Sequence, residues 1–414
     1  MMKRTTILSA LSIILAISTV FAQDSLSTYD RQIANLDQQV ADMDGKIDKT
    51  FSLMKPGKSK FMLRGYFHSG FEGVSTGDDW EYNFSGGKIA PILMYKQSDK
   101  LFFEAEFEGG FTADGEFDWG MEYADITYVI NKYVTVRAGK FVLPFGSFME
   151  KLHPAWINKL ATVPLGYGHD GIAPGSDVGA ELRGAFNVGS VKLNYQAYVV
   201  NGPQLKVGDD VPEEAGGLKF DYLKDNNPNK AVGGRIGIFP IQNSMLEIGV
   251  SAMTAKVGDK GSAYEDVRAN LFAVDFNLVK NLNFMKSVID IKAQYNYNQV
   301  SDANYAVPDD TTDLFYDFRN VSSGYYVQMA LRPSLVDNKF LRNLELVGRY
   351  SAIETPEGSL WEQAPKQWAV GLNYWLNWRT VLKLGYQSTS GLGDHDAADL
   401  LTQNMFYIHW AMGF

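Results

Sequence analysis

Three carboxylates stand at every second position of one segment, at Glu104, Glu106 and Glu108. Side chains two residues apart on an extended strand point to the same face, so these three predict an acidic stripe that attracts cations. The longest loop, 142–177, and its flanks have a local excess of basic residues, which weakly favours anions instead. There Arg137, Lys140, Lys151, His153, Lys159 and Arg183 outnumber Glu150, Asp170, Asp177 and Glu181. The alternative for both sets is paired, solvated charge with little selectivity.

Catalytic chemistry has no comparable signal in this chain. The five histidines, at positions 68, 153, 169, 395 and 409, lie far apart in the sequence without metal-ligand spacing, and no serine stands in a nucleophile-elbow context. The chain has no cysteine, which excludes disulfides and thiolate ligands. We therefore predict no enzyme activity, no metal site and no cofactor.

The elements that must position the charged residues are strands with an apolar and a polar face. In 191–199 the odd positions are apolar or aromatic and the even positions are polar, and 289–297 repeats this pattern. Alternation of this kind suits a wall with lipid on one side and water on the other. About sixteen such segments occur: 61–72, 88–97, 101–110, 121–130, 133–141, 178–188, 190–200, 231–240, 244–254, 266–278, 286–298, 322–333, 340–351, 367–377, 379–388 and 404–414. The sequence predicts an all-β fold, an antiparallel transmembrane β-barrel of about sixteen strands.

The connections between these segments alternate between short and long. Short turns lie at 97–100, 131–132, 189–190, 241–243 and 377–378, and long polar loops lie between them, including 73–87, 111–120, 142–177, 201–230 and 389–403. Such alternation places every long loop at one end of a barrel. An even strand number then puts both barrel termini at the short-turn end, which we expect to face the periplasm.

The N-terminus indicates export. Lys3 and Arg4 precede an apolar stretch from Ile7 to Val20, so we predict a signal peptide at 1–22. After it no run of about 18 apolar residues occurs, which argues against membrane-spanning helices. The net charge of −10 becomes −12 when Lys3 and Arg4 are removed, and a chain this acidic is a poor candidate for nucleic acid. The last strand, Met405 to Phe414, alternates and ends on an aromatic residue, which is typical of outer-membrane barrels.

Residues 23–57 predict a short periplasmic coiled-coil helix, followed by the barrel at 58–414. The 3-4 spacing of a heptad seam runs through this segment, and the seam residues predicted to join copies of the chain are Ile33, Leu36, Val40, Met43 and Ile47. A lone helix with so narrow an apolar stripe has marginal stability in water. We therefore favour the interpretation that helices from other copies of the chain bury this stripe. The alternative is an amphipathic helix packed on its own barrel.

Strand number also bears on function, because sixteen strands leave an aqueous channel whereas eight do not. The longest loop, 142–177, carries more apolar residues than a loop in water should, including Phe145, Phe148 and Leu160. We predict that it docks on the inner wall and constricts the lumen; the alternative is a loop packed at a subunit interface or over the rim. The residues predicted to line the pore or its constriction are Arg64, Glu104, Glu106, Glu108, Arg137, Lys151, Lys159, Glu181, Arg183 and Lys192.

Two runs around this loop carry a resemblance. Arg137-Ala-Gly-Lys-Phe-Val-Leu-Pro-Phe-Gly146 and Asp177-Val-Gly-Ala-Glu-Leu-Arg183-Gly look like the phosphate-selective porin O and P family. The resemblance implies a trimeric, sixteen-stranded outer-membrane barrel, often preceded by a helical segment. It also implies lumenal arginines and lysines that attract anions such as phosphate, of which this sequence offers only part.

These observations predict a passive porin for small hydrophilic solutes or ions in the outer membrane of a Gram-negative bacterium. Its expected partners are membrane lipids and two further copies of the same chain. The alternative is a nonconducting barrel that serves as a surface anchor or adhesin.

Overall fold

The structure is a computed structural model that describes residues 60–77, 79–112, 115–168, 171–208, 211–220, 224–241, 245–307, 315–394 and 397–414. The predicted signal peptide at 1–22 and the predicted coiled coil at 23–57, with its seam residues, lie outside the described residues. Those two predictions therefore stay predictions.

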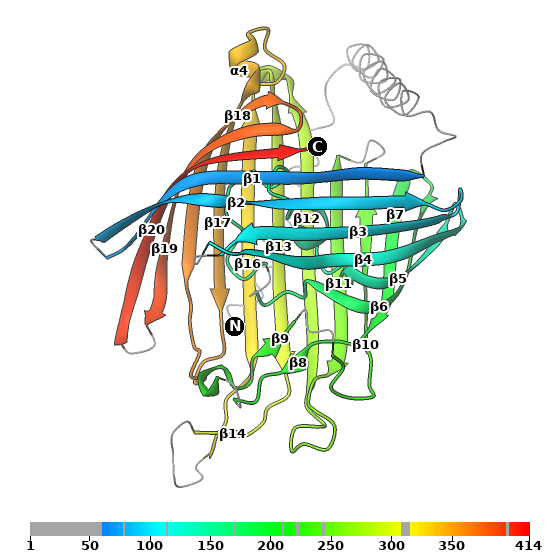
Figure 1. Cartoon of the computed structure of the whole chain (residues 1–414), viewed down its shortest axis with the longest axis vertical. Helices are drawn as coiled ribbons and strands as arrows, with labels where there is room; N and C mark the ends of the chain where they lie inside the picture. The colour runs from blue at the N-terminus through cyan, green and yellow to red at the C-terminus, as the bar shows by residue number, and fades with distance from the viewer. Residues whose placement is uncertain are drawn as a thin grey trace. The chain divides into compact units, whose positions relative to one another are not determined.

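Sixteen antiparallel strands close into one barrel (Figure 1). Each strand pairs with the next barrel strand along the chain, and the last pairs with the first, where Tyr66 lies opposite Gly413. The first strands are β1 (Phe61–Thr76), β2 (Asp79–Lys96), β3 (Leu101–Phe111), β4 (Phe117–Asn131), β5 (Val134–Val142), β6 (Ser176–Val188), β7 (Val191–Val200) and β10 (Ala231–Phe239). The others are β11 (Leu246–Lys256), β12 (Arg268–Leu282), β13 (Ser287–Val300), β16 (Val321–Arg332), β17 (Leu344–Glu354), β18 (Lys366–Asn377), β19 (Thr380–Asp394) and β20 (Ala397–Gly413). The predicted fold and strand number are confirmed.

Sequence alternation produces the two faces of the wall. On β20, Ile408 and Trp410 are 45% and 48% exposed on the outer face, whereas Tyr407 and His409 are buried on the inner face. The first and last strands of the barrel join near its two termini, where Phe414 N donates to Gly65 O (2.9 Å) and Gly65 N donates to Phe414 O (3.2 Å). Both barrel termini therefore lie at the short-turn end.

Two predicted long loops are wrong. Most of 73–87 belongs to β1 and β2, which pair as far as Thr76–Asp79 across a turn where Gly77 has a φ of +70°. Most of 389–403 likewise belongs to β19 and β20, which pair as far as Asp394–Ala397. The polar residues of these segments indicated loops, but cross-strand hydrogen bonding extends the hairpins through them.

Helices are few and short among the described residues. They comprise α3 (Phe148–Lys151), α4 (Lys339–Asn343), and the 3-10 turns η1 (Pro212–Glu214) and η2 (Asn283–Met285). The predicted strand start at 340 is wrong, because Asn338 caps α4 by accepting hydrogen bonds from the Phe340 and Leu341 amides. Within the described residues, no helix has the length and apolar character needed to cross a membrane.

The inner face of the barrel is not polar throughout. At the long-loop end of β7 and β10–β13 it is apolar and packs against the following loops, which contain the small pairs β8 (Gln204–Leu205) with β9 (Leu218–Lys219) and β14 (Tyr305–Ala306) with β15 (Phe315–Tyr316). Val200, Met253 and Leu271 are buried in this cluster. The expectation of a polar inner face fails here, because the loops fold back and supply an apolar partner for these side chains.

Candidate functional site: a loop held across the barrel interior

The segment 143–175 leaves β5 and returns to β6 through a closed neck, where Leu143 N donates to Gly175 O at 2.9 Å. Its apolar side chains are buried, with Phe145, Phe148 and Leu160 each at most 2% exposed. Phe148 packs edge-on against Tyr326, an inner-face residue of β16. The segment therefore packs inside the barrel, and we call it the inner loop.

The start of the inner loop is fixed to β11 and β13. Gly146 N donates to Ser251 Oγ at 3.0 Å, and the amides of Ser147 and Phe148 donate to Gln294 Oε1 at 2.8 and 3.0 Å. Gly146 has a φ of +68°, and a Cβ there would meet the Gln294 amide group at 2.0 Å. Only glycine allows this approach of the loop to the wall.

The far part of the inner loop is held by two buried cations. Lys383 Nζ on β19 donates to the carbonyl oxygens of Ala155, Asn158 and Leu160, at 2.6, 2.5 and 3.2 Å. Arg349 on β17 donates to the carbonyl oxygens of Thr162 and Val163, at 2.7 and 3.0 Å.

Lys383 and Arg349 donate hydrogen bonds to carbonyl groups of the inner loop, because the irregular backbone of this loop does not supply donors for them. Sequence alternation places both on the inner face, but it carries no signal that they bind this loop.

Most of the predicted cations near the loop are paired with carboxylates, whereas Lys140 Nζ donates to the backbone carbonyl of Met121 at 2.6 Å. Arg137 Nε donates to Glu181 Oε2 at 2.7 Å, and Arg183 Nε donates to Glu181 Oε1 at 2.6 Å. Arg183 also donates from Nη2 to Glu150 on α3 at 2.5 Å. Glu181 is 2% exposed and therefore serves as a shared anion between two guanidinium groups at the root of the loop.

The two predicted lysines of the loop are paired with the opposite wall. Lys151 Nζ lies 2.8 Å from Glu247 on β11, and Lys159 Nζ lies 2.5 Å from Glu345 on β17. Lys159 also approaches Asp290 of β13 at 3.5 Å. The sequence alternative of paired charge therefore describes these residues better than a set of bare cations does.

Glu150 lies on α3, apart from the strands. Burial by itself would raise the pKa of its carboxyl group. The guanidinium of Arg183 outweighs this effect, and the pKa of Glu150 is lowered from its ordinary value of 4.5.

The carboxylates of the acidic stripe on β3 contact side chains of other strands. Tyr123 donates to Glu104 at 2.6 Å, Tyr66 donates to Glu106 at 2.9 Å, and Lys88 lies 3.1 Å from Glu108. Glu106 thus receives a hydroxyl donor from β1, and Glu104 receives one from β4. His153 of the inner loop approaches Glu106 at 4.0 Å, which brings the loop near this wall as well.

Among the contacts of the described residues, neither Arg64 nor Lys192 touches the inner loop. Arg64 is exposed near the start of β1, where its Nε lies 2.9 Å from Met62 Sδ. Lys192 lies near the start of β7, with its Nζ 5.3 Å from the ring centre of Phe239. Both belong to the short-turn end of the barrel.

Two of the histidines are neighbours in the structure, which their separation in the sequence does not indicate. His68 and His409, far apart in the sequence, lie on adjacent strands where the barrel closes, with 3.0 Å between His68 Nδ1 and His409 Nε2. The pairing of the first strand with the last brings them together. Within the described part of the chain, no group of three or more His, Asp or Glu side chains is arranged to hold a metal ion.

Comparison with known proteins gives a match in structure only. No family model and no curated protein matches this chain. The anion-selective porin from Comamonas acidovorans is 12% identical, with a TM-score of 0.53 over 86% of this chain and 99% of the other. The outer membrane channel DcaP of Acinetobacter baumannii is also 12% identical, with a TM-score of 0.53 over 86% and 97%. Pseudomonas putida OprB is 8% identical, with a TM-score of 0.52 over 86% and 94%.

These likenesses show that the chain has the fold of outer-membrane porin barrels. At such identities they show the fold alone.

Proposed function

We propose that this chain is a passive porin, a diffusion channel for small hydrophilic solutes or ions in the outer membrane of a Gram-negative bacterium. One observation carries the proposal, the inner loop tied across the interior of a closed barrel with an apolar outer face. A closed barrel satisfies its backbone hydrogen bonds in lipid, and the inner loop would set the size of the path through it. No energy source or cofactor is needed for diffusion.

The charge of the path supports weak selectivity. Arg137, Lys151, Lys159 and Arg183 are each paired with a carboxylate, so their positive potential is largely offset at close range. The stripe from Glu104 to Glu108 has one lysine and two hydroxyl donors. We propose that the channel passes small ions of both signs, and that its likeness to the phosphate-selective porin O and P family at 133–186 concerns architecture more than phosphate preference.

Assembly is the second part of the proposal. The seam at Ile33, Leu36, Val40, Met43 and Ile47 supports association of several copies through the N-terminal helices in the periplasm. The family resemblance implies three copies. Chemical crosslinking of the full chain in membranes would test this, because a product limited to dimers would contradict a trimer.

A second candidate is a nonconducting barrel that acts as a surface anchor. The apolar cluster around Met253 and Leu271 favours it, because this cluster fills part of the interior at the long-loop end. The inner loop also reaches β11, β13, β17 and β19, which narrows the remaining space.

Conductance separates the two candidates. The purified chain would be inserted in a planar lipid bilayer, and single-channel current and reversal potential would be measured across a potassium chloride gradient, with and without phosphate. Stepwise openings with a small reversal potential support the porin. Block by phosphate with strong anion preference would contradict weak selectivity, and folded protein that never opens would favour the anchor.

A further inference from the structure

The rim of the barrel has a notch at its short-turn end. The last residues that pair between β5 and β6 are Thr135 and Arg183, whereas β6 continues to Val188 and pairs there with Val191 of β7. The β6–β7 hairpin therefore projects beyond the turn that joins β4 to β5. The edge of β6 past Arg183 has no strand beside it on the β5 side.

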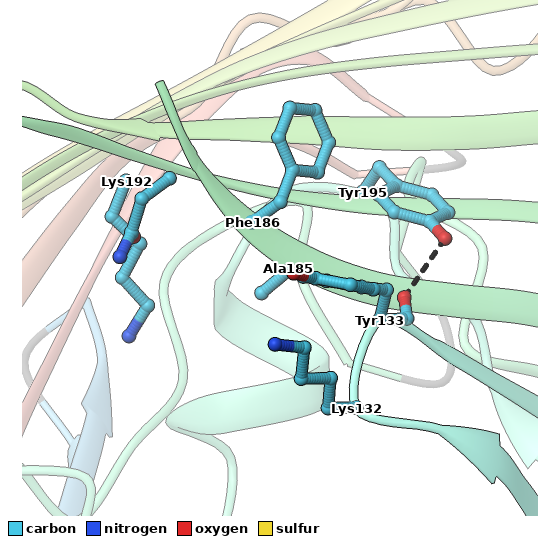
Figure 2. A pocket seen from close by; sticks show the side chains of 7 residues that line it. Lys132, Tyr133, Ala185, Phe186, Lys192 and Tyr195 are labelled. Carbon is cyan, nitrogen blue, oxygen red and sulfur yellow. Dashed lines mark hydrogen bonds between the residues drawn. The ribbon is translucent and has the colours of Figure 1, made fainter. Parts of the chain in front are cut away.

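A pocket of about 880 Å3 lies in this notch. Lys132 and Tyr133 of the β4–β5 turn line one side, and Asn187 of β6 and Lys192 of β7 line the other. Figure 2 shows the side chains of Lys132 and Lys192 reaching from two directions toward the same open space. Two separate elements thus contribute one ammonium group each to the pocket.

These two ammonium groups differ from the paired lysines of the inner loop. Lys132 Nζ lies 4.7 Å from the ring centre of Tyr133, and Lys192 Nζ lies 5.3 Å from that of Phe239. Among the ion pairs of the described residues, neither lysine takes part. Because aromatic faces do not cancel a positive charge, both ammonium groups can attract an anion.

Two of the other lining residues of the notch, Phe186 and Tyr195, are aromatic. Phe186 is 40% exposed on the outer face of β6, and Figure 2 shows it with Tyr195 on the side of the strand away from the two lysines. Tyr195 donates its hydroxyl hydrogen to Tyr133 O at 3.0 Å, which fastens the turn to the hairpin. Outward aromatic residues at the end of a barrel lie at the level of lipid headgroups.

We propose that this notch binds the phosphate group of an anionic phospholipid of the periplasmic leaflet. The phosphate would lie between Lys132 and Lys192, and the lipid glycerol and upper acyl chain would contact Phe186 and Tyr195. A free phosphate ion would use the ammonium groups alone, so the adjoining aromatic surface favours the lipid. This inference rests on the proposed orientation of the barrel, with its short turns in the periplasm.

The test measures lipid retained by the full chain. Protein in nanodiscs of phosphatidylcholine with phosphatidylglycerol would be extracted into mild detergent, and bound lipid would be counted by native mass spectrometry. K132Q/K192Q removes both charges, K132R/K192R keeps them, and K100Q, in the exposed turn between β2 and β3, is the matched control. A lysine near an anionic membrane surface contributes about 1 kcal/mol, so we expect about thirtyfold weaker phosphatidylglycerol binding in the Gln double variant alone.

Each outcome decides the proposal. Loss of phosphatidylglycerol in the Gln variant, with retention in the Arg variant and in K100Q, supports it. Equal retention by the Gln variant and the unchanged chain overturns it. Inorganic phosphate that displaces the lipid at equal concentration overturns the lipid assignment in favour of a free anion.

Conductance of the same preparations keeps this result separate from the proposed function. Lipid binding by a chain that never conducts would support the notch and contradict the porin. A chain that conducts but retains no lipid at the notch would support the porin and contradict the lipid site.

Discussion

Replacing Lys383 by methionine tests whether one buried ammonium group holds the far part of the inner loop on the barrel wall. Lys383 is 1% exposed, and its Nζ donates to Ala155 O, Asn158 O and Leu160 O. Methionine is similar in length but has no donor. The variant therefore removes three hydrogen bonds to a charged group while largely preserving the shape of the wall.

The expected size of the effect follows from these contacts. Leaving one buried acceptor without its donor costs about 1–3 kcal/mol, and three carbonyl groups lose their donor here, so we expect a cost of at least about 3 kcal/mol. Since about 1.4 kcal/mol corresponds to a factor of ten, the ratio of released to docked loop should rise by at least about a hundredfold. Asn373 still donates to Lys159 O, and Arg349 still donates to Thr162 O, so the loop should loosen without leaving the barrel.

Single-channel recording in a planar bilayer is the assay. We expect K383M to show higher open-channel noise and a higher mean conductance than the unchanged chain, and K383R to lie closer to the unchanged chain. Heat-modifiable migration in gels checks that the barrel is folded, and K100M serves as an exposed control. A folded K383M barrel with unchanged conductance and unchanged noise would refute the role of Lys383 in fixing the loop.

Three further predictions concern the wall, the charge and the pH response. V250R places a cation on the outer face of β11, where Val250 is 55% exposed. In urea unfolding from lipid, it should destabilise the barrel by about 2–4 kcal/mol, whereas V250L should not. Equal stability of V250R and the unchanged chain would mean that this face does not contact lipid. E181Q removes the anion shared by Arg137 and Arg183, so the reversal potential should shift toward anions, and no shift in a folded channel would show that these charges lie off the path. The pKa of Glu150 is lowered in the folded chain, so its ion pair with Arg183 stabilises the loop above pH 4.5 and is lost as the pH falls through the folded pKa. Conductance noise should therefore rise on acidification. E150Q should show no such rise if Glu150 is its cause.

Alternation along the chain was enough to predict most of the barrel. Residues 191–199 and 405–414 have a repeat of two with one apolar face, and only a closed sheet can use such strands in lipid. Two of the errors fell on 73–87 and 389–403, where polar residues continue as paired strands. Composition cannot distinguish a polar loop from a polar hairpin extension, because hydrogen bonds to a neighbouring strand decide between them.

The candidate site was predictable only in part. The apolar residues of 142–177 indicated an inner loop, and the structure places Phe145 and Phe148 inside the barrel. The partners of its charges were not predictable. Lys151 meets Glu247, which is 96 residues away in the chain, and Lys383 meets a backbone carbonyl 228 residues away.

The strand number and the two faces of the wall could be predicted from the residues alone, because both depend on a local repeat of two. Contacts between distant strands in the folded chain set which inward charges meet, bring His68 beside His409, and place Lys132 and Lys192 in one notch. The physical reason is that closure and register bring together side chains from distant strands. The charge that a solute or lipid encounters then depends on which charged side chains are paired with one another, and not on residue types alone.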